Sequence, residues 1–100
     1  MRISCLCQKI RNIHESDINT LACKGNYILS GGEEGWLNII DDRTYKVVEK
    51  FEMEKPIHGI QFNPVTNHFA IGREYLEIYE LDKVLEEHKM NSIFTHLGMR

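Results

Sequence analysis

Three polar side chains of this 100-residue chain could together do hydrolytic chemistry: His14, Ser30 and Asp41. A serine nucleophile, a histidine base and an aspartate that orients the base form the catalytic triad of many hydrolases. Ser30, however, lies outside any Gly-x-Ser-x-Gly turn of the kind that presents such a serine, although Gly31 and Gly32 follow it. Neither a convergent pair of carboxylates nor a phosphate-binding glycine loop is visible elsewhere. We therefore predict that these residues serve the structure and that the chain is not an enzyme.

Cysteine and histidine side chains could instead hold a zinc ion. The chain has cysteines at positions 5, 7 and 23 and five histidines. The pair Cys5 and Cys7 lacks the two-residue gap of a structural zinc site, and no second pair of ligands follows at a matching distance. An odd number of cysteines also does not make a disulfide framework, which favours a reducing compartment. We therefore predict no metal and no cofactor, and we expect the cysteines to fill small spaces in the core.

Charge and hydropathy narrow the classes of partner. The 12 basic and 15 acidic residues give a formal net charge of −3, which offers no electrostatic reason to expect nucleic acid or an anionic membrane. No apolar run is long enough to cross a bilayer, and the first residues lack the apolar stretch of a secretory signal. The expectation is therefore a soluble protein of the cytoplasm.

The elements that would carry these residues are short strands joined by tight turns. Apolar and polar residues alternate with the period of two that is typical of strands, and helical periodicity is nearly absent before residue 81. Glycine and asparagine, which tolerate a positive φ, mark the turns. The predicted strands of this first unit are 18–23, 27–30, 36–41 and 45–51.

A second unit repeats the pattern. Its turn at 63–67 contains Pro64, whose fixed φ suits the second position of such a turn. Residues 82–89 fit either a short helix capped by Asp82 or a frayed fourth strand. The predicted strands of this unit are 57–62, 68–71 and 75–80. Equivalent apolar residues of the two units lie 39 positions apart: Ile18 and Ile57, Leu21 and Ile60, Leu37 and Leu76.

A period near 40 with four strands per unit is the sequence signature of β-propeller blades. We therefore predict an all-β chain of antiparallel four-stranded meanders, which form about two blades of an incomplete propeller or a fragment of one. The expected division is a strand of a preceding blade in 1–13, blades in 14–52 and 53–88, and a tail or the start of a further blade in 89–100. Each blade buries a face on its neighbour, so open faces and edges imply a partner chain or missing blades.

The first unit resembles the WD repeat. His14 precedes its first strand, Ser30 ends the second, Glu34 lies in the tight turn, and Asp41 closes the third. In that family a histidine, a serine or threonine, an aspartate of the tight turn and a tryptophan form a hydrogen-bond network inside the blade. The resemblance implies a partial structural network of these four residues, because Ile40 stands where the tryptophan would be.

The order of motifs from residue 8 to residue 87 is most similar to the fifth and sixth blades of the receptor for activated C kinase family. The segments that carry this resemblance are 29–35, Asn63-Pro64 after the strand 57–62, and the shortened hairpin 71–81. The resemblance implies a signalling and translation scaffold whose partner is the small ribosomal subunit. The alternative is a WD-repeat subunit of another assembly, such as a ubiquitin-ligase adaptor, a coat or a checkpoint complex.

Propellers bind other proteins mainly through the segments before each first strand and the hairpins between second and third strands. Trp36 is the only tryptophan, and it would serve either as an exposed anchor or as packing between blades. The candidate partner-binding residues are therefore Glu15, Asp17, Glu33, Trp36, Lys55 and His58.

Overall fold

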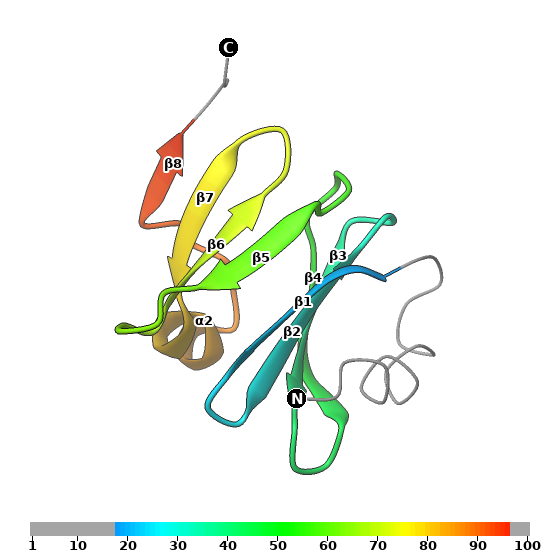
Figure 1. The fold of residues 1–100 in the computed structure, drawn as a ribbon, viewed down its shortest axis with the longest axis vertical. Coiled ribbons are helices and arrows are strands. Elements are labelled where there is room, and N and C mark those ends of the chain that lie inside the picture. The colour runs from blue at the N-terminus through cyan, green and yellow to red at the C-terminus, as the bar shows by residue number, and fades with distance from the viewer. Residues whose placement is uncertain (1–17, 97–100) are drawn as a thin grey trace.

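A computed structural model gives the fold and describes residues 18–96. This part of the chain consists of short strands and a helix of two turns, labelled as in Figure 1. The elements are β1 (Ile18–Lys24), β2 (Tyr27–Gly32), β3 (Trp36–Asp41), β4 (Lys46–Glu52), β5 (Gly59–Phe62), β6 (His68–Gly72), β7 (Leu76–Glu80), α2 (Leu81–Glu87) and β8 (Phe94–His96).

The strands form two four-stranded antiparallel sheets, in the orders β1-β2-β3-β4 and β5-β6-β7-β8. Strands that follow one another in the chain are neighbours in each sheet, so both sheets are meanders (Figure 1). This confirms the two predicted four-stranded units. The sequence pattern located strands β1 to β7 to within two residues, because tight turns bound these apolar segments.

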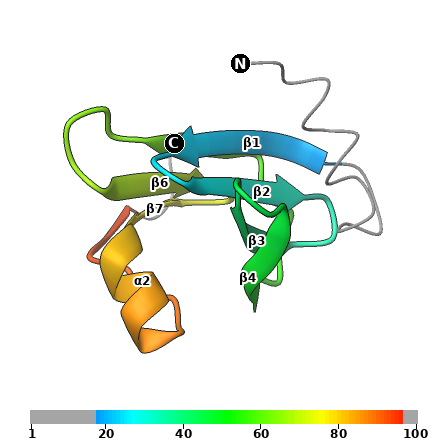
Figure 2. The same cartoon turned by 90° about the horizontal axis from the view of Figure 1, so that it is seen from below.

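The main core lies between the two sheets. Leu37 and Ile39 of the first sheet are fully buried and pack in one cluster with Phe69 and Ile71 of the second sheet. The strands β1 and β5 lie side by side, and the Oγ1 atom of Thr20 accepts a hydrogen bond of 3.1 Å from the backbone N–H of Ile60. In the view from below, α2 and β4 lie on the same side of β2 (Figure 2).

The close approach of the two sheets depends on Gly31 in β2. A Cβ atom added to Gly31 would lie 2.6 Å from Cγ2 of Ile57, the residue that leads into β5. Ile57 is fully buried, its N–H donates to the carbonyl of Gly32 at 3.2 Å, and its own carbonyl accepts from Nδ2 of Asn19 at 3.0 Å. Because these bonds hold its backbone, Ile57 cannot move aside without losing them.

We expect Gly31→Ala to lower the free energy of unfolding by about 1–3 kcal/mol, the usual cost of adding a methyl group to a packed core. The matched control is Gly59→Ala, since a Cβ atom added there meets no atom within 4 Å. Chemical denaturation followed by circular dichroism measures both variants. Equal stability of the two would show that the sheets do not pack this closely in solution.

The end of the second unit differs from the sequence pattern. Residues Leu81–Glu87 form a helix, which resolves the choice between helix and strand, and the buried side chains of Leu81 and Val84 anchor it. The residue at its N-cap is Glu80, which makes no side-chain cap hydrogen bond, so the predicted cap Asp82 lies instead in the first turn.

Within the described residues, no helix is long and apolar enough to cross a membrane.

The fourth strand of the second sheet is β8, which comes after the helix. It pairs with β7, with Phe94 opposite Ile78. The second unit therefore extends to His96, beyond residue 88 where the sequence pattern ended it, and part of the predicted tail supplies its outer strand. The strand predicted in 1–13 lies outside the described residues.

Candidate interaction surface

Turns from both sheets gather at one end of the structure. These are the β2–β3 turn with the first residue of β3 (33–36), the β4–β5 connection (53–58) and the β6–β7 turn (73–75), which lie toward the top of Figure 1. We call these residues the upper loop surface. The β4–β5 connection joins the three segments, since Lys55 pairs with Glu74 at 3.8 Å and the N–H of Met53 donates to the carbonyl of Gly35 at 2.7 Å.

The upper loop surface contains four of the six predicted partner-binding residues. Glu33, Lys55 and His58 are exposed, and Oε1 of Glu33 accepts a hydrogen bond of 3.1 Å from Nδ2 of Asn19. The other two predicted residues, Glu15 and Asp17, lie outside the described residues. The fold therefore brings together charged side chains that are far apart in the sequence.

Trp36 is the fourth of these residues. It is neither a fully exposed anchor nor packed between the blades, the two roles predicted for it. It is half-buried at the start of β3, and Nζ of Lys50 lies 4.7 Å from its ring centroid. Side chains alternate along β3, so Trp36 lies on the face opposite to that of Leu37 and Ile39. It therefore does not pack between the two sheets, and Lys50 covers part of the surface that it would offer to a partner.

The structure describes only part of the predicted structural network, because His14 lies outside residues 18–96. Ser30 is fully buried in β2 opposite Asn38, and Glu34 is half-buried in the β2–β3 turn. Asp41 pairs with Tyr27, three residues from Ser30 along β2. An odd separation places Ser30 and Asp41 on opposite faces of the sheet, about 10 Å apart along the strand.

This arrangement has two consequences. Asp41 does not contact Ser30 directly, and the network that the family resemblance implies with His14 and Glu34 stays a prediction. The same separation is incompatible with a hydrolase triad, because Asp41 would have to orient a histidine that contacts the serine.

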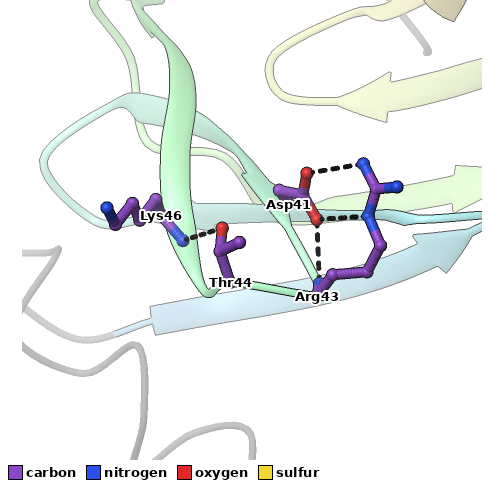
Figure 3. Close-up of polar contacts among 4 residues, drawn as sticks. All are labelled: Asp41, Arg43, Thr44 and Lys46. Carbon is purple, nitrogen blue, oxygen red and sulfur yellow. Dashed lines mark hydrogen bonds and ion pairs between the residues drawn. The ribbon is translucent and has the colours of Figure 1, made fainter.

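Asp41 instead organises the β3–β4 turn (Figure 3). Its carboxylate accepts hydrogen bonds from the backbone N–H of Arg43 at 2.8 Å, from Nε at 3.1 Å and from Nη2 at 2.9 Å. The N–H of Lys46 donates to Oγ1 of Thr44 at 3.3 Å, and Tyr45 has a φ of 59°. The hydrogen bonds from Arg43 hold the pKa of Asp41 below its ordinary value, and Asp41 raises the pKa of Arg43.

The lowered pKa of Asp41 predicts a contribution to acid stability. A carboxyl group whose pKa is depressed by folding stabilises the folded state above its unfolded pKa, and this contribution is lost as the pH falls through the folded pKa. We therefore expect Asp41→Asn to lower the melting temperature slightly at pH 7 and to flatten its decline below about pH 4. Arg43→Met should have the same effect, and the double variant should add nothing. Melting curves between pH 2 and pH 7 test this, and additive effects would contradict the pairing.

A buried polar cluster in the second sheet was not anticipated from the sequence. Nη2 of Arg73 donates to Oε1 of Glu77 at 2.8 Å and to the Tyr75 hydroxyl at 2.9 Å, and Nη1 donates to the carbonyl of Met53. The side chains of Arg73 and Glu77 are only 7% and 12% exposed. The cluster therefore ties the β6–β7 hairpin to the β4–β5 connection. The sequence feature that could have indicated this cluster is an arginine in a tight turn, four residues before a glutamate in a strand.

The electrostatics of this cluster follow from burial. Burial disfavours the charged form of Arg73, but the hydrogen bond and the charge of Glu77 outweigh it and raise the pKa of Arg73 above its ordinary value. Burial and a hydrogen bond to Glu77 also raise the pKa of the Tyr79 phenol far above its ordinary value. Arg73 and Glu77 thus form a charged pair next to a neutral tyrosine.

In the part of the chain that the structure describes, little supports metal binding or a reactive cysteine. Between residues 18 and 96, no group of three histidine, cysteine, aspartate or glutamate side chains could hold a metal ion. Cys23 is half-buried, and burial together with the charge of Asp42 raises the pKa of its thiol. A thiol with a raised pKa is a poor nucleophile at neutral pH.

Two four-stranded meanders that pack face to face, with their first strands side by side, are arranged like adjacent blades of a β-propeller. The fold is therefore all-β, and it corresponds to about two blades of a partial propeller. The sequence matches no family model and no curated protein.

Among solved structures, the chain is similar to the β-propeller domain of Cps50 (Swd1) from Myceliophteria thermophila, with a TM-score of 0.59 and 19% sequence identity. The match covers 68% of this chain and 23% of that chain, so this chain spans less than a quarter of the propeller that it resembles. At this level of identity the likeness shows the fold alone.

Proposed function

We propose that the chain is part of a WD-repeat propeller that acts as a protein-interaction scaffold without catalysis. The observation that carries this proposal is the upper loop surface, where turns from both sheets place exposed charged side chains on a rigid pair of blades. Binding residues are concentrated on loops that a rigid scaffold positions. The exposed groups of this surface include Glu33, Glu54, Lys55, His58 and Glu74.

We further propose that the scaffold belongs with the receptor for activated C kinase family, and that it binds the small ribosomal subunit in the cytoplasm. The order of motifs in the sequence supports this assignment: the Ser-Gly-Gly segment at the end of β2, the Asn63-Pro64 turn and the shortened β6–β7 hairpin. The resemblance extends over both sheets, so it concerns the scaffold as a whole and assigns no single residue to ribosome contact.

Exposed apolar surface supports the need for further protein contacts. Leu76 and Phe94, on the face of the second sheet that is turned away from the first, are 37% and 50% exposed. In a propeller each blade covers such a face of its neighbour. We therefore expect the purified chain to self-associate, or to remain in solution only with a partner. Light scattering at several concentrations tests this, and a folded monomer at every concentration would contradict it.

Capture of partners from cells, with chemical cross-linking and mass spectrometry, tests the scaffold function. We expect the substitutions Lys55→Glu and His58→Glu on the upper loop surface to abolish recovery of the principal partner. The control is Lys83→Glu, on the exposed side of α2 at the other end of the molecule. Recovery of small-subunit proteins supports the ribosomal assignment, and recovery of a different assembly contradicts it. Equal recovery with all variants would refute a scaffold that binds through this surface.

A further inference from the structure

A cavity of about 310 Å³ opens beside the upper loop surface. One side is formed by Glu52 at the end of β4 and by Glu54 in the β4–β5 connection. The other side is formed by Arg73, Tyr75 and Tyr79 of the second sheet, and by Met90 after α2. We call this space the acidic cavity. Its size is at the lower end of the range, about 300–1,000 Å³, of sites that bind small groups.

The charge of the acidic cavity is negative. Arg73 and Glu77 neutralise one another, because they form an ion pair at 2.8 Å within the wall. Glu52 and Glu54 are exposed, and their carboxylates have no hydrogen bond or ion pair with any residue between 18 and 96. Two carboxylates without a cation therefore face an opening whose other charges cancel.

The walls are suited to a long basic side chain. Tyrosine rings attract cations over their faces, and Cζ of Arg73 already lies 4.8 Å from the ring centroid of Tyr75. Met90 supplies apolar surface for a methylene chain. Arg73 also has a buried Nε atom with no hydrogen-bond partner in the described part of the chain. An Nε–H group needs an acceptor, and because this one is closed off from solvent, a peptide carbonyl would reach it only after a shift of the Arg73 side chain.

We propose that the acidic cavity binds a lysine or arginine side chain from a segment of a protein partner. The charge complementarity with Glu52 and Glu54, the tyrosine and methionine walls, and the unsatisfied donor of Arg73 all fit this occupant. The inference rests on the proposed scaffold function and names the chemistry of one contact in it. The partner's basic side chain lies between the two blades and contacts both.

The experiment uses the full chain and three blocked tripeptides: Ac-Ala-Arg-Ala-amide, Ac-Ala-Lys-Ala-amide and, as the uncharged probe, Ac-Ala-Gln-Ala-amide. Titration is followed by ¹H–¹⁵N correlation spectra. We expect the basic tripeptides to shift the amide signals of Glu54, Tyr75 and Met90 in a saturable manner, and the glutamine tripeptide to have no such effect. Equal shifts with all three tripeptides, or saturable shifts confined to other residues, would overturn the proposal.

The double variant Glu52→Gln and Glu54→Gln removes the two charges and keeps the side-chain volume. We expect it to weaken binding of the basic tripeptides about tenfold, as expected for the loss of two exposed ion pairs. The matched control, Asp42→Asn with Glu86→Gln, makes the same change in net charge away from the cavity and from the upper loop surface. Equal weakening by the two double variants would show a general charge effect and refute the site.

The two proposals can fail separately. If the basic tripeptides bind at the cavity but no partner is recovered through the upper loop surface, the scaffold function fails and the cavity stands. If a partner is recovered through that surface but the tripeptides do not distinguish charge, the scaffold function stands and the cavity proposal fails.

Discussion

Replacing Ile39 with aspartate is expected to unfold the protein at 25 °C. Ile39 is fully buried between the two sheets, opposite Leu29 on β2 and Glu49 on β4. Loss of a buried isoleucine side chain costs about 2–5 kcal/mol, and burying an unpaired carboxylate costs several more. The nearby charge of Glu49 would repel it. The sum is comparable with the whole stability of a typical domain, about 5–15 kcal/mol.

The control for this prediction is Val65→Asp, since Val65 is 87% exposed in the turn between β5 and β6. It makes the same kind of change, from a β-branched apolar side chain to a carboxylate, where water can solvate the charge. We expect a cooperative thermal transition near that of the parent protein for Val65→Asp and none for Ile39→Asp. A cooperative transition in Ile39→Asp, observed by circular dichroism, would show that the intersheet core is misplaced.

The sequence predicted β2 and β3 well because both strands are rich in apolar residues and are bounded by tight turns. Leu29, Leu37 and Ile39 are buried on one face of these strands, and Ile28 and Ile40 are buried on the other. The outer strand β8 was not predicted, since its three residues are too few to show a period. The short segment 82–89 allowed a helix or a strand, and burial of Val84 in the three-dimensional fold decides for the helix.

The polar cluster shows why alternation alone does not predict every face. In β7 the apolar residues Leu76 and Ile78 alternate with Glu77 and Tyr79, so hydropathy would place Leu76 inside and Glu77 outside. The structure has the reverse, with Leu76 37% exposed and Glu77 9% exposed. Glu77 tolerates burial because Arg73, from the preceding turn, supplies the opposite charge. Such pairing is visible only when the hairpin register is known.

The distance between residues along the sequence also limits what can be predicted about the interaction surface. Glu33, Lys55 and His58 were predicted as a set because they come from the segments that form one end of a blade. The acidic cavity was not, because its two sides come from different sheets. Glu54 and Tyr75 are 21 positions apart, and only the packing of the second sheet against the first makes them line one space.

Arg73→Met is expected to lower the free energy of unfolding by about 3 kcal/mol, because removal of one member of a buried ion pair leaves the other charge without compensation. Glu77 would remain 9% exposed with its cation removed, and the carbonyl of Met53 would lose the Arg73 donor and keep the N–H of Lys55. Urea denaturation measures the change. A loss below about 1 kcal/mol would mean that the pair is solvated in solution.

Two further variants separate the ion pair from general effects of charge. Lys55→Met breaks the pair with Glu74, whose side chains are 55% and 66% exposed at 3.8 Å, and should cost less than about 1 kcal/mol. The double variant Arg73→Met with Glu77→Leu should recover much of the loss, since apolar residues of similar volume often replace a buried ion pair without destabilisation. Recovery would show that the cost of Arg73→Met lies in the stranded charge of Glu77. No recovery would assign it to the lost hydrogen bond from Arg73 to the carbonyl of Met53, in the connection between the sheets.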